Sequence, residues 1–187
     1  VDRAAGDATT NPAPSFVGKK ITNLTFWRNR LGILADQNIT LTENGEFFNY
    51  YITTGTDVLD TDPIDVAVSG TTVNKLYNAV DFNSQLLCFT EEGQYELVGK
   101  GEAVSPTDAV LKKRSTFNHA KKVTPLTSGK YLYFAQDRND KTAIRAYYSN
   151  DDTLTNDSDE TTAHVKRYVP SNAHKLISSE LENTLCV

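Results

Sequence analysis

The chain is a succession of short apolar stretches separated by polar, turn-forming residues. Three such stretches lie close together, at residues 26–27, 31–34 and 39–41. Strand-length apolar stretches with turn residues between them indicate antiparallel β-strands that follow one another in a meander. The Thr-, Gly- and Asp-rich stretch 43–63 predicts a long loop before extended structure resumes at 64–68. Aromatic residues at 47–51 within this loop are interpreted as a packing plug, with a sugar-stacking platform as the alternative.

The apolar pattern repeats along the chain. Four apolar quartets, each preceded by a turn-rich patch, occupy residues 31–34, 86–89, 131–134 and 184–187. Their starts are 45 to 55 residues apart, which is the size of a four-stranded propeller blade with some additional loop. The sequence therefore predicts an all-β fold, a propeller-like array of antiparallel four-stranded blades.

This repeat divides the chain into a linker and one propeller-like domain. We expect the linker at residues 1–20 and the domain at 21–187, with blades at roughly 21–70, 71–120 and 121–170 and the start of a fourth. The last strands of the second and third blades are predicted at 110–114 and 165–169. Residues 72–79 fit either an inner strand or a helix, and the strand is the favoured interpretation.

The composition indicates a globular domain that belongs to a longer protein. Hydrophobic residues make up 39% of the chain, with 9 Tyr, 8 Phe and 1 Trp, which is enough to fill a sizeable core. The single tryptophan, Trp27, is expected inside that core. No apolar run approaches the ~18 residues of a membrane-spanning helix. Because the chain begins with Val and contains no Met, we expect an internal fragment whose remaining blades come from other sequence.

The charge distribution argues against a dedicated nucleic-acid-binding module. The net charge is −5, with 19 basic and 24 acidic residues. The basic residues occur in short groups among acidic ones and do not form one basic stretch. We therefore expect no appreciable binding of duplex DNA.

Two acidic stretches contain candidate cation-binding or catalytic carboxylates, the second of them only as a calcium loop. Asp57, Asp60, Asp62 and Asp65 cluster as a cation site or a glycoside-hydrolysing pair would. Aspartate is also the expected turn former in such a Thr- and Gly-rich loop, so the structural interpretation is favoured. The acidic run 150–160 lacks the Gly and final Glu of an EF-hand and is interpreted as a mobile loop.

The histidines and cysteines form no recognisable catalytic or metal-binding pattern. His119, His164 and His174 stand alone, without a second ligand or a nucleophile at a motif spacing. Cys88 and Cys186 lie far apart between apolar neighbours, so buried free thiols are expected in place of a disulfide or a metal site. The sequence thus predicts no enzyme activity, no cofactor and no metal.

Three short motifs in the first third of the chain point to a known family. They are RNRLG at 28–32, FFNYY at 47–51 and DTDPID at 60–65. In this order they resemble the tail tubular protein B, or nozzle protein, family of T7-like short-tailed phages. The residues that match the family pattern are Arg28, Asn29, Arg30, Leu31, Gly32, Asn49, Asp60, Asp62, Pro63 and Asp65.

The resemblance implies a structural virion protein of the phage tail. Such a nozzle assembles as a homo-oligomeric ring, binds a tail adaptor protein and tail fibre proteins, and leaves a lumen through which phage DNA passes without specific binding. The alternative is a propeller-type glycan-binding or glycan-cleaving domain that uses the loop between Asp57 and Asp65. Members of the family are several times longer than 187 residues, which agrees with an internal fragment.

Overall fold

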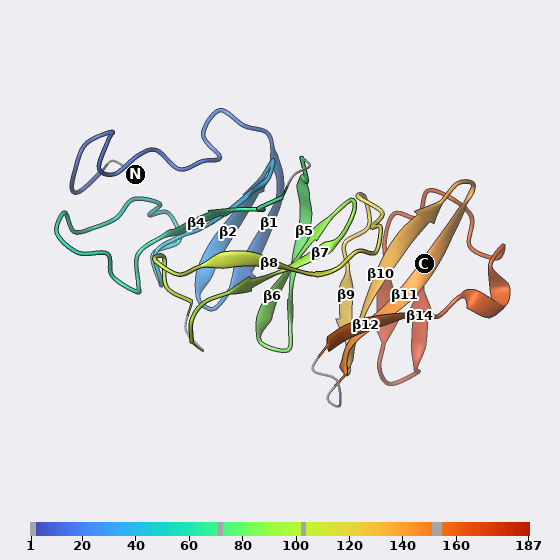
Figure 1. Cartoon of the computed structure of the whole chain (residues 1–187). Coiled ribbons are helices and arrows are strands. Elements are labelled where there is room, and N and C mark those ends of the chain that lie inside the picture. The colour runs from blue at the N-terminus through green and yellow to red at the C-terminus, as the bar shows by residue number, and fades with distance from the viewer. Residues whose placement is uncertain (1–2, 71–72, 102–103, 151–154) are drawn as a thin grey trace.

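The computed structural model describes residues 3–70, 73–101, 104–150 and 155–187, and β-strands dominate it (Figure 1). The strands form three four-stranded antiparallel sheets, called the first, second and third sheets below, and one C-terminal hairpin. Among the described residues the helical structure is one short 3-10 helix, η1 (Ala163–Val165). The all-β prediction is thereby confirmed.

The first sheet is a meander with the strand order β1-β2-β3-β4. Its strands are β1 (Ile21–Trp27), β2 (Arg30–Ala35), β3 (Asn38–Leu41) and β4 (Ile64–Ala67). Two-residue turns join the first three strands, with positive φ angles at Arg28, Asn29 and Asp36, a backbone region that Asn and Asp tolerate better than most residues. The predicted long loop at 43–63 separates β3 from β4.

The second sheet repeats this order as β5-β6-β7-β8. Its strands are β5 (Leu76–Phe82), β6 (Gln85–Thr90), β7 (Gln94–Val98) and β8 (Val110–Ser115). Asn83 and Ser84 form the tight β5–β6 turn with positive φ. The strand interpretation of residues 72–79 is confirmed from residue 76 onward, and Thr72 lies outside the described residues.

The third sheet has the same order, and the C-terminal hairpin follows it. The strands are β9 (Leu126–Ser128), β10 (Tyr131–Arg138), β11 (Lys141–Asn150) and β12 (Thr155–Glu160), then β13 (Ile177–Ser179) and β14 (Thr184–Cys186). The four apolar quartets therefore fall in β2, β6, β10 and β14, the second strand of each successive unit. The repeat inferred from the sequence is a repeat in the structure.

The fourth strand of the third sheet does not lie where we expected it. The prediction placed it at 165–169, after a mobile acidic loop, whereas β12 occupies Thr155–Glu160 within that acidic run and η1 begins before Val165. The prediction was wrong because β12 is an edge strand, and its exposed Asp157 and Asp159 give it no apolar alternation. Residues 151–154 of the run lie outside the described residues.

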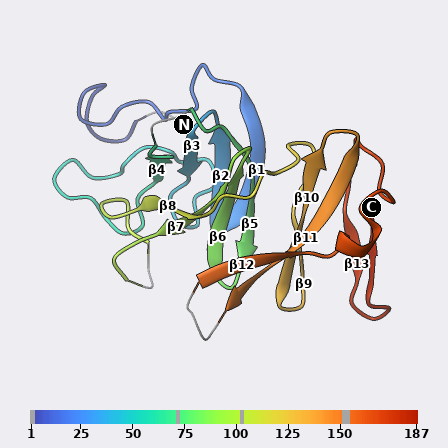
Figure 2. The same ribbon diagram turned by 45° about the vertical axis from the view of Figure 1, so that its right-hand side comes forward.

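Successive sheets stack in the same orientation, so the sheets follow one another in space as they do in sequence (Figures 1 and 2). Along one side β1 contacts β5, β5 contacts β9 and β9 contacts β13. Along the other side β4 contacts β8 and β8 contacts β12. Each of these strands therefore meets the strand four places later in the chain.

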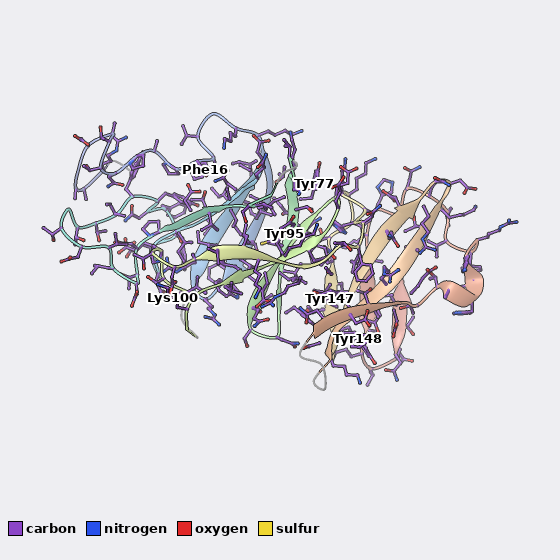
Figure 3. All side chains as sticks on the ribbon, in the orientation of Figure 1. Phe16, Tyr77, Tyr95, Lys100, Tyr147 and Tyr148 are labelled. Atoms are coloured by element: carbon purple, nitrogen blue, oxygen red, sulfur yellow. The ribbon has the colours of Figure 1, made fainter. Side chains whose placement is uncertain are left out.

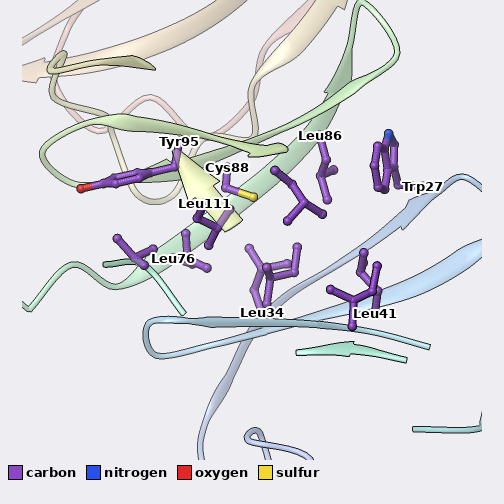
Figure 4. Packing of buried hydrophobic residues seen from close by; sticks show 12 residues of the cluster. Trp27, Leu34, Leu41, Leu76, Leu86, Cys88, Tyr95 and Leu111 are labelled. Atoms are coloured by element: carbon purple, nitrogen blue, oxygen red, sulfur yellow. The ribbon is translucent and has the colours of Figure 1, made fainter. Parts of the chain in front are cut away.

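Three clusters of buried residues fill the spaces between the units. The first interface, between the first and second sheets, is largely aliphatic and contains Trp27 (Figure 4). The second interface, between the second and third sheets, is mainly aromatic and is formed by Phe82, Leu87, Phe89, Leu132, Phe134 and Tyr147. The third cluster joins the third sheet to the segment that carries the hairpin and includes Ala135, Ile144 and Leu176. Trp27 is 3% exposed, which confirms its predicted place in the core.

Candidate functional site

Two of the family-motif residues, Asp60 and Asp62, bind the buried guanidinium of a third, Arg30, at the start of β2. Nη1 of Arg30 donates to the carbonyls of Thr42 and Asp62, and Nη2 donates to the carbonyl of Asp60, each at 2.7 Å. Burial lowers the pKa of Arg30, while the nearby Asp62 and Glu43 carboxylates oppose that shift, and the group stays charged because arginine does not deprotonate in proteins. Arg30 thus ties both ends of the 43–63 loop to the first sheet.

The Asp62 carboxylate stabilises the same loop from inside. Asp62 is fully buried; its Oδ2 accepts from the Leu59 amide at 2.8 Å, and its Oδ1 accepts from the amide and hydroxyl of Thr53 at 3.4 and 3.2 Å. Buried carboxylates that accept backbone N–H bonds hold turns in place. The Asp62 side chain is therefore occupied by its own loop.

Asn49 fixes the aromatic part of the loop. Its Nδ2 donates to the Glu43 carboxylate at 2.6 Å, and its Oδ1 accepts from the Tyr51 amide at 3.0 Å. Backbone bonds from Glu43 to the Asn49 carbonyl and from Asn49 to the Glu46 carbonyl close the same turn. The segment that carries Phe47 and Phe48 is therefore held by both side-chain and backbone hydrogen bonds.

The RNRLG motif combines turn geometry with close packing. The Asn29 carbonyl accepts from the Gly45 amide at 3.0 Å, which attaches the long loop to the β1–β2 turn. A Cβ at Gly32 would lie 2.7 Å from Cγ2 of Thr25 and 2.8 Å from Cδ2 of Leu41, so a side chain does not fit there. Leu31 is half-buried, and its amide donates to the Thr42 hydroxyl at 3.0 Å.

Arg28 and Asp65 attach the first sheet to other parts of the chain. The Arg28 guanidinium lies 4.6 Å from the centre of the Trp27 ring and donates to the Ser84 carbonyl at 3.0 Å. Asp65 accepts from the amide and hydroxyl of Ser15 at 2.8 and 2.6 Å. Pro63 lies between buried Asp62 and β4 and restricts the backbone where the loop ends.

This arrangement does not favour the glycan alternative. Asp62 is buried, Asp65 is bonded to Ser15, and Asp57 and Asp60 are exposed in the loop. A glycoside hydrolase needs two carboxyl groups that face one bond of the sugar. The hydrogen bonds of Arg30, Asp62 and Asn49 show that the polar groups of the motifs hold the loop in place.

The remaining candidate residues are dispersed. His119 is 3% exposed, accepts from Nδ2 of Asn78 through Nε2 at 2.9 Å, and has its pKa lowered to about 4 by burial. His164 and His174 are exposed on separate segments. Within residues 3–70, 73–101, 104–150 and 155–187 no three His, Cys, Asp or Glu side chains are grouped to hold a metal ion. No helix in this part of the chain is long and apolar enough to span a membrane.

The expectation for the two cysteines is half wrong. Both thiols are free; Cys88 is buried, and burial raises its pKa to about 12, whereas Cys186 is exposed on β14. Cys186 lies on the hairpin face that points away from the third sheet, since its neighbour Leu185 packs toward that sheet. An apolar neighbourhood in sequence therefore did not imply burial.

Sequence reasoning missed a polar seam between β1 and β5. The Thr22 hydroxyl donates to the Leu76 carbonyl at 2.8 Å, Thr25 donates to Ala79 at 3.3 Å, and Asn23 donates to Oδ1 of Asn78 at 2.7 Å. These bonds join two sheets that share no backbone ladder. The polar residues Thr22, Asn23 and Thr25 carry no sequence motif that would have identified them as partners of β5.

The N-terminal segment also belongs to this assembly. Asn11 is 3% exposed; its Nδ2 donates to the Ile52 carbonyl at 3.0 Å, and its Oδ1 accepts from the Ile52 amide at 3.3 Å. Phe16, labelled in Figure 3, meets Tyr50 edge-on with 5.0 Å between the ring centres. The segment therefore packs on the long loop and on the outer half of the first sheet.

Comparison with known proteins agrees with the resemblance of the motifs. The model of a family described as "Bacteriophage nozzle protein" matches residues 1–187. The chain is 36% identical over 182 residues to the "Tail tubular protein gp12" of Escherichia phage T7. The aligned part covers 97% of this chain and 23% of that protein, so the chain spans about a quarter of the length of the curated relative it matches.

Proposed function

Because the chain belongs to the bacteriophage nozzle protein family, we propose that it is a structural segment of a tail nozzle in the virion. The family match over residues 1–187 is the observation that carries this function. The geometry is consistent with it, since the polar motif residues stabilise a loop and two sheet contacts. The segment acts through its shape and its surfaces.

The three sheets are proposed to be consecutive blades of a propeller. Two features support this architecture: each sheet has the same strand order, and β1, β5, β9 and β13 contact one another in sequence. The blade boundaries at 21–70, 71–120 and 121–170 form part of this proposal.

The complete protein is proposed to form a homo-oligomeric ring around a channel for phage DNA. Its partners in this proposal are the tail adaptor protein and the tail fibre proteins. The net charge of −5 supports a conduit, because neutralising phosphates with Lys and Arg would hold the DNA in place. The acidic stretches at 57–65 and 155–160 keep the surface unfavourable for a polyanion.

The test uses virions and the full-length protein. Purified particles are separated into heads and tails, and an antibody raised against residues 1–187 locates the protein, while electron microscopy of the tails shows its arrangement. We expect the protein in the tail, as a ring around a channel. Its absence from tails, or release of reducing sugars from glycans by the purified protein, would overturn the structural assignment.

A further inference from the structure

Exposed apolar side chains occur on β1 and on the part of the long loop that packs beside it. They are Leu24, Phe26, Phe47 and Phe48, which are 57%, 59%, 37% and 75% exposed. Phe26 on β1 and Phe47 on the long loop touch edge-to-face, with 5.3 Å between the ring centres. Exposed aromatic side chains gathered in one place mark interaction surfaces more often than chance surface composition does. We call these four residues the aromatic patch.

The aromatic patch is held in position before any partner arrives. Asn49 closes the turn that carries Phe47 and Phe48, and Arg30 attaches both ends of the loop. Asn11 binds the same loop at Ile52 from the N-terminal segment. A fixed aromatic surface loses little conformational entropy when it is covered, which favours affinity.

The long loop that carries Phe47 and Phe48 is acidic. The loop contributes Glu43, Glu46, Asp57 and Asp60 beside buried Asp62, and the sequence has no Lys or Arg between Arg30 and Lys75. A bond from the Asn44 amide to the Thr61 carbonyl at 2.9 Å holds the two halves of the loop together. The loop beside the patch is therefore negative, and we call its exposed carboxylates the acidic rim.

Two cations near this region already have contacts within the chain. Arg3 lies 5.3 Å from the centre of the Tyr51 ring and donates to the Asn11 carbonyl at 2.7 Å. Arg28 lies over Trp27 and donates to Ser84. The carboxylates of Glu46, Asp57 and Asp60 are left facing outward.

We propose that the aromatic patch is a docking surface for a second protein of the tail, one that presents an apolar pocket rimmed by Lys or Arg. This inference rests on the proposed function, because it places the partner in the same tail. The acidic rim selects a basic partner. It disfavours a second copy of this chain, which carries a net charge of −5, and it disfavours DNA and anionic lipid.

Zero-length cross-linking of intact tails tests the chemistry of the partner. A carbodiimide joins carboxylates directly to lysine amines, so tails treated with it and digested should yield peptides that link Glu46, Asp57 or Asp60 to lysines of another tail protein. Hydroxyl-radical labelling of the same tails should show Phe48 protected relative to the free protein. Leu181, which is 91% exposed on the C-terminal hairpin, is the matched reference position for that labelling.

A pair of exposed-site variants checks the result in solution. Phe48→Ser should weaken association with the cross-linked partner by about tenfold or more, the effect of removing an aromatic hot spot, whereas Leu181→Ser should leave it unchanged. Both sites are exposed, so circular dichroism should show that both variants fold.

Three results would overturn the inference. They are equal labelling of Phe48 in tails and in the free protein, links only to the same polypeptide or to another copy of it, and unchanged affinity of Phe48→Ser. Absence of the protein from tails altogether would instead defeat the proposed function, and an immunoblot of the same sample distinguishes the two failures.

Discussion

The first and second interfaces have the same geometry and different chemistry. In the first interface aliphatic side chains such as Leu34, Leu41 and Leu86 surround Trp27 and Cys88. In the second, the rings of Phe89, Phe134 and Tyr147 contact one another at tilted or edge-on angles. The second interface also buries a titratable group, His119, whose ring centre lies 5.0 Å from that of Phe89.

This contrast shows that the stacking of the sheets depends on where apolar faces occur and tolerates large changes in what fills them. Adjacent residues of β6 illustrate the point, since Cys88 faces the first interface and Phe89 faces the second. Alternate side chains of a strand point to opposite faces of its sheet. A strand between two neighbouring sheets must therefore be apolar on both faces, as β6 is.

The largest effect is expected for the first interface. Trp27→Ala should lower the free energy of unfolding by about 3–5 kcal/mol, because it removes the largest side chain of that cluster and leaves a cavity. Chemical denaturation measures the loss. An unchanged unfolding midpoint would mean that Trp27 contributes little and that the aliphatic residues alone hold the two sheets.

Acid should weaken the second interface through His119. The folded pKa of His119 is about 4, below its ordinary value of 6.5, so between these values the unfolded chain binds more protons. Stability is therefore complete above pH 6.5 and falls as the pH drops toward 4, by on the order of 3 kcal/mol from this residue. Chemical unfolding of wild type and His119→Gln at several pH values in this range measures how steeply the free energy of unfolding falls with pH in each protein. Equal slopes would contradict the role given to His119.

A smaller effect is expected from Phe89→Leu in the second interface. Leucine keeps most of the apolar volume and loses the ring contacts with Phe134 and His119, so a cost of about 1–2 kcal/mol is expected. Differential scanning calorimetry measures it. Leu86→Ile in the first interface is the comparison for a shape change without ring contacts, and an equal cost for both would show that ring geometry adds nothing.

The polar seam between β1 and β5 should contribute less again. Asn23→Ala removes the donor to Oδ1 of buried Asn78 and should cost about 1 kcal/mol. Hydrogen exchange at the β1 and β5 amides should show whether the loss is local to this seam. A cost as large as that of Trp27→Ala would make the seam, and not the apolar cluster, the main contact between the two sheets.

No measurable effect is expected for DNA. Both interfaces turn apolar side chains inward and leave an acidic surface, with 24 acidic and 19 basic residues in all. Filter binding with duplex DNA at physiological salt should show no association tighter than the ~10⁻⁶ M end of nonspecific binding. Tighter, salt-sensitive binding would assign the chain a role in holding DNA.

The strands of the first two sheets could be predicted because their apolar residues must fill shared interfaces. The turns at Asn29 and Asn83 could also be predicted, because Asn adopts the positive φ angles that these turns require. The strand β12 was not predictable in this way, because it lies at an exposed edge of its sheet and its sequence, which includes exposed Asp157, has no alternation of apolar residues. Hydrophobic periodicity arises where one face of a strand is buried, and an edge strand that buries few side chains shows little periodicity.

The motif residues were identified from the sequence, but their mutual contacts were not. Arg30 meets Asp60 and Asp62 only because the loop folds back over the start of β2, and it does so through backbone carbonyls that carry no sequence signal. The seam at Asn23 was missed because a polar residue on a strand is usually a surface residue. Hydrogen bonds between polar residues far apart in the chain leave no pattern in the sequence that would predict them.

The charged outer strands limit how copies of this protein can meet in a crowded solution. Lys112 and Lys113 are exposed on β8, and Asp157 and Asp159 are exposed on β12. A free strand edge invites another chain to add to its backbone ladder, and charges on the edge discourage this. Strand addition at β8 and β12, a route to fibrils, is therefore disfavoured while many copies of the protein are present during assembly.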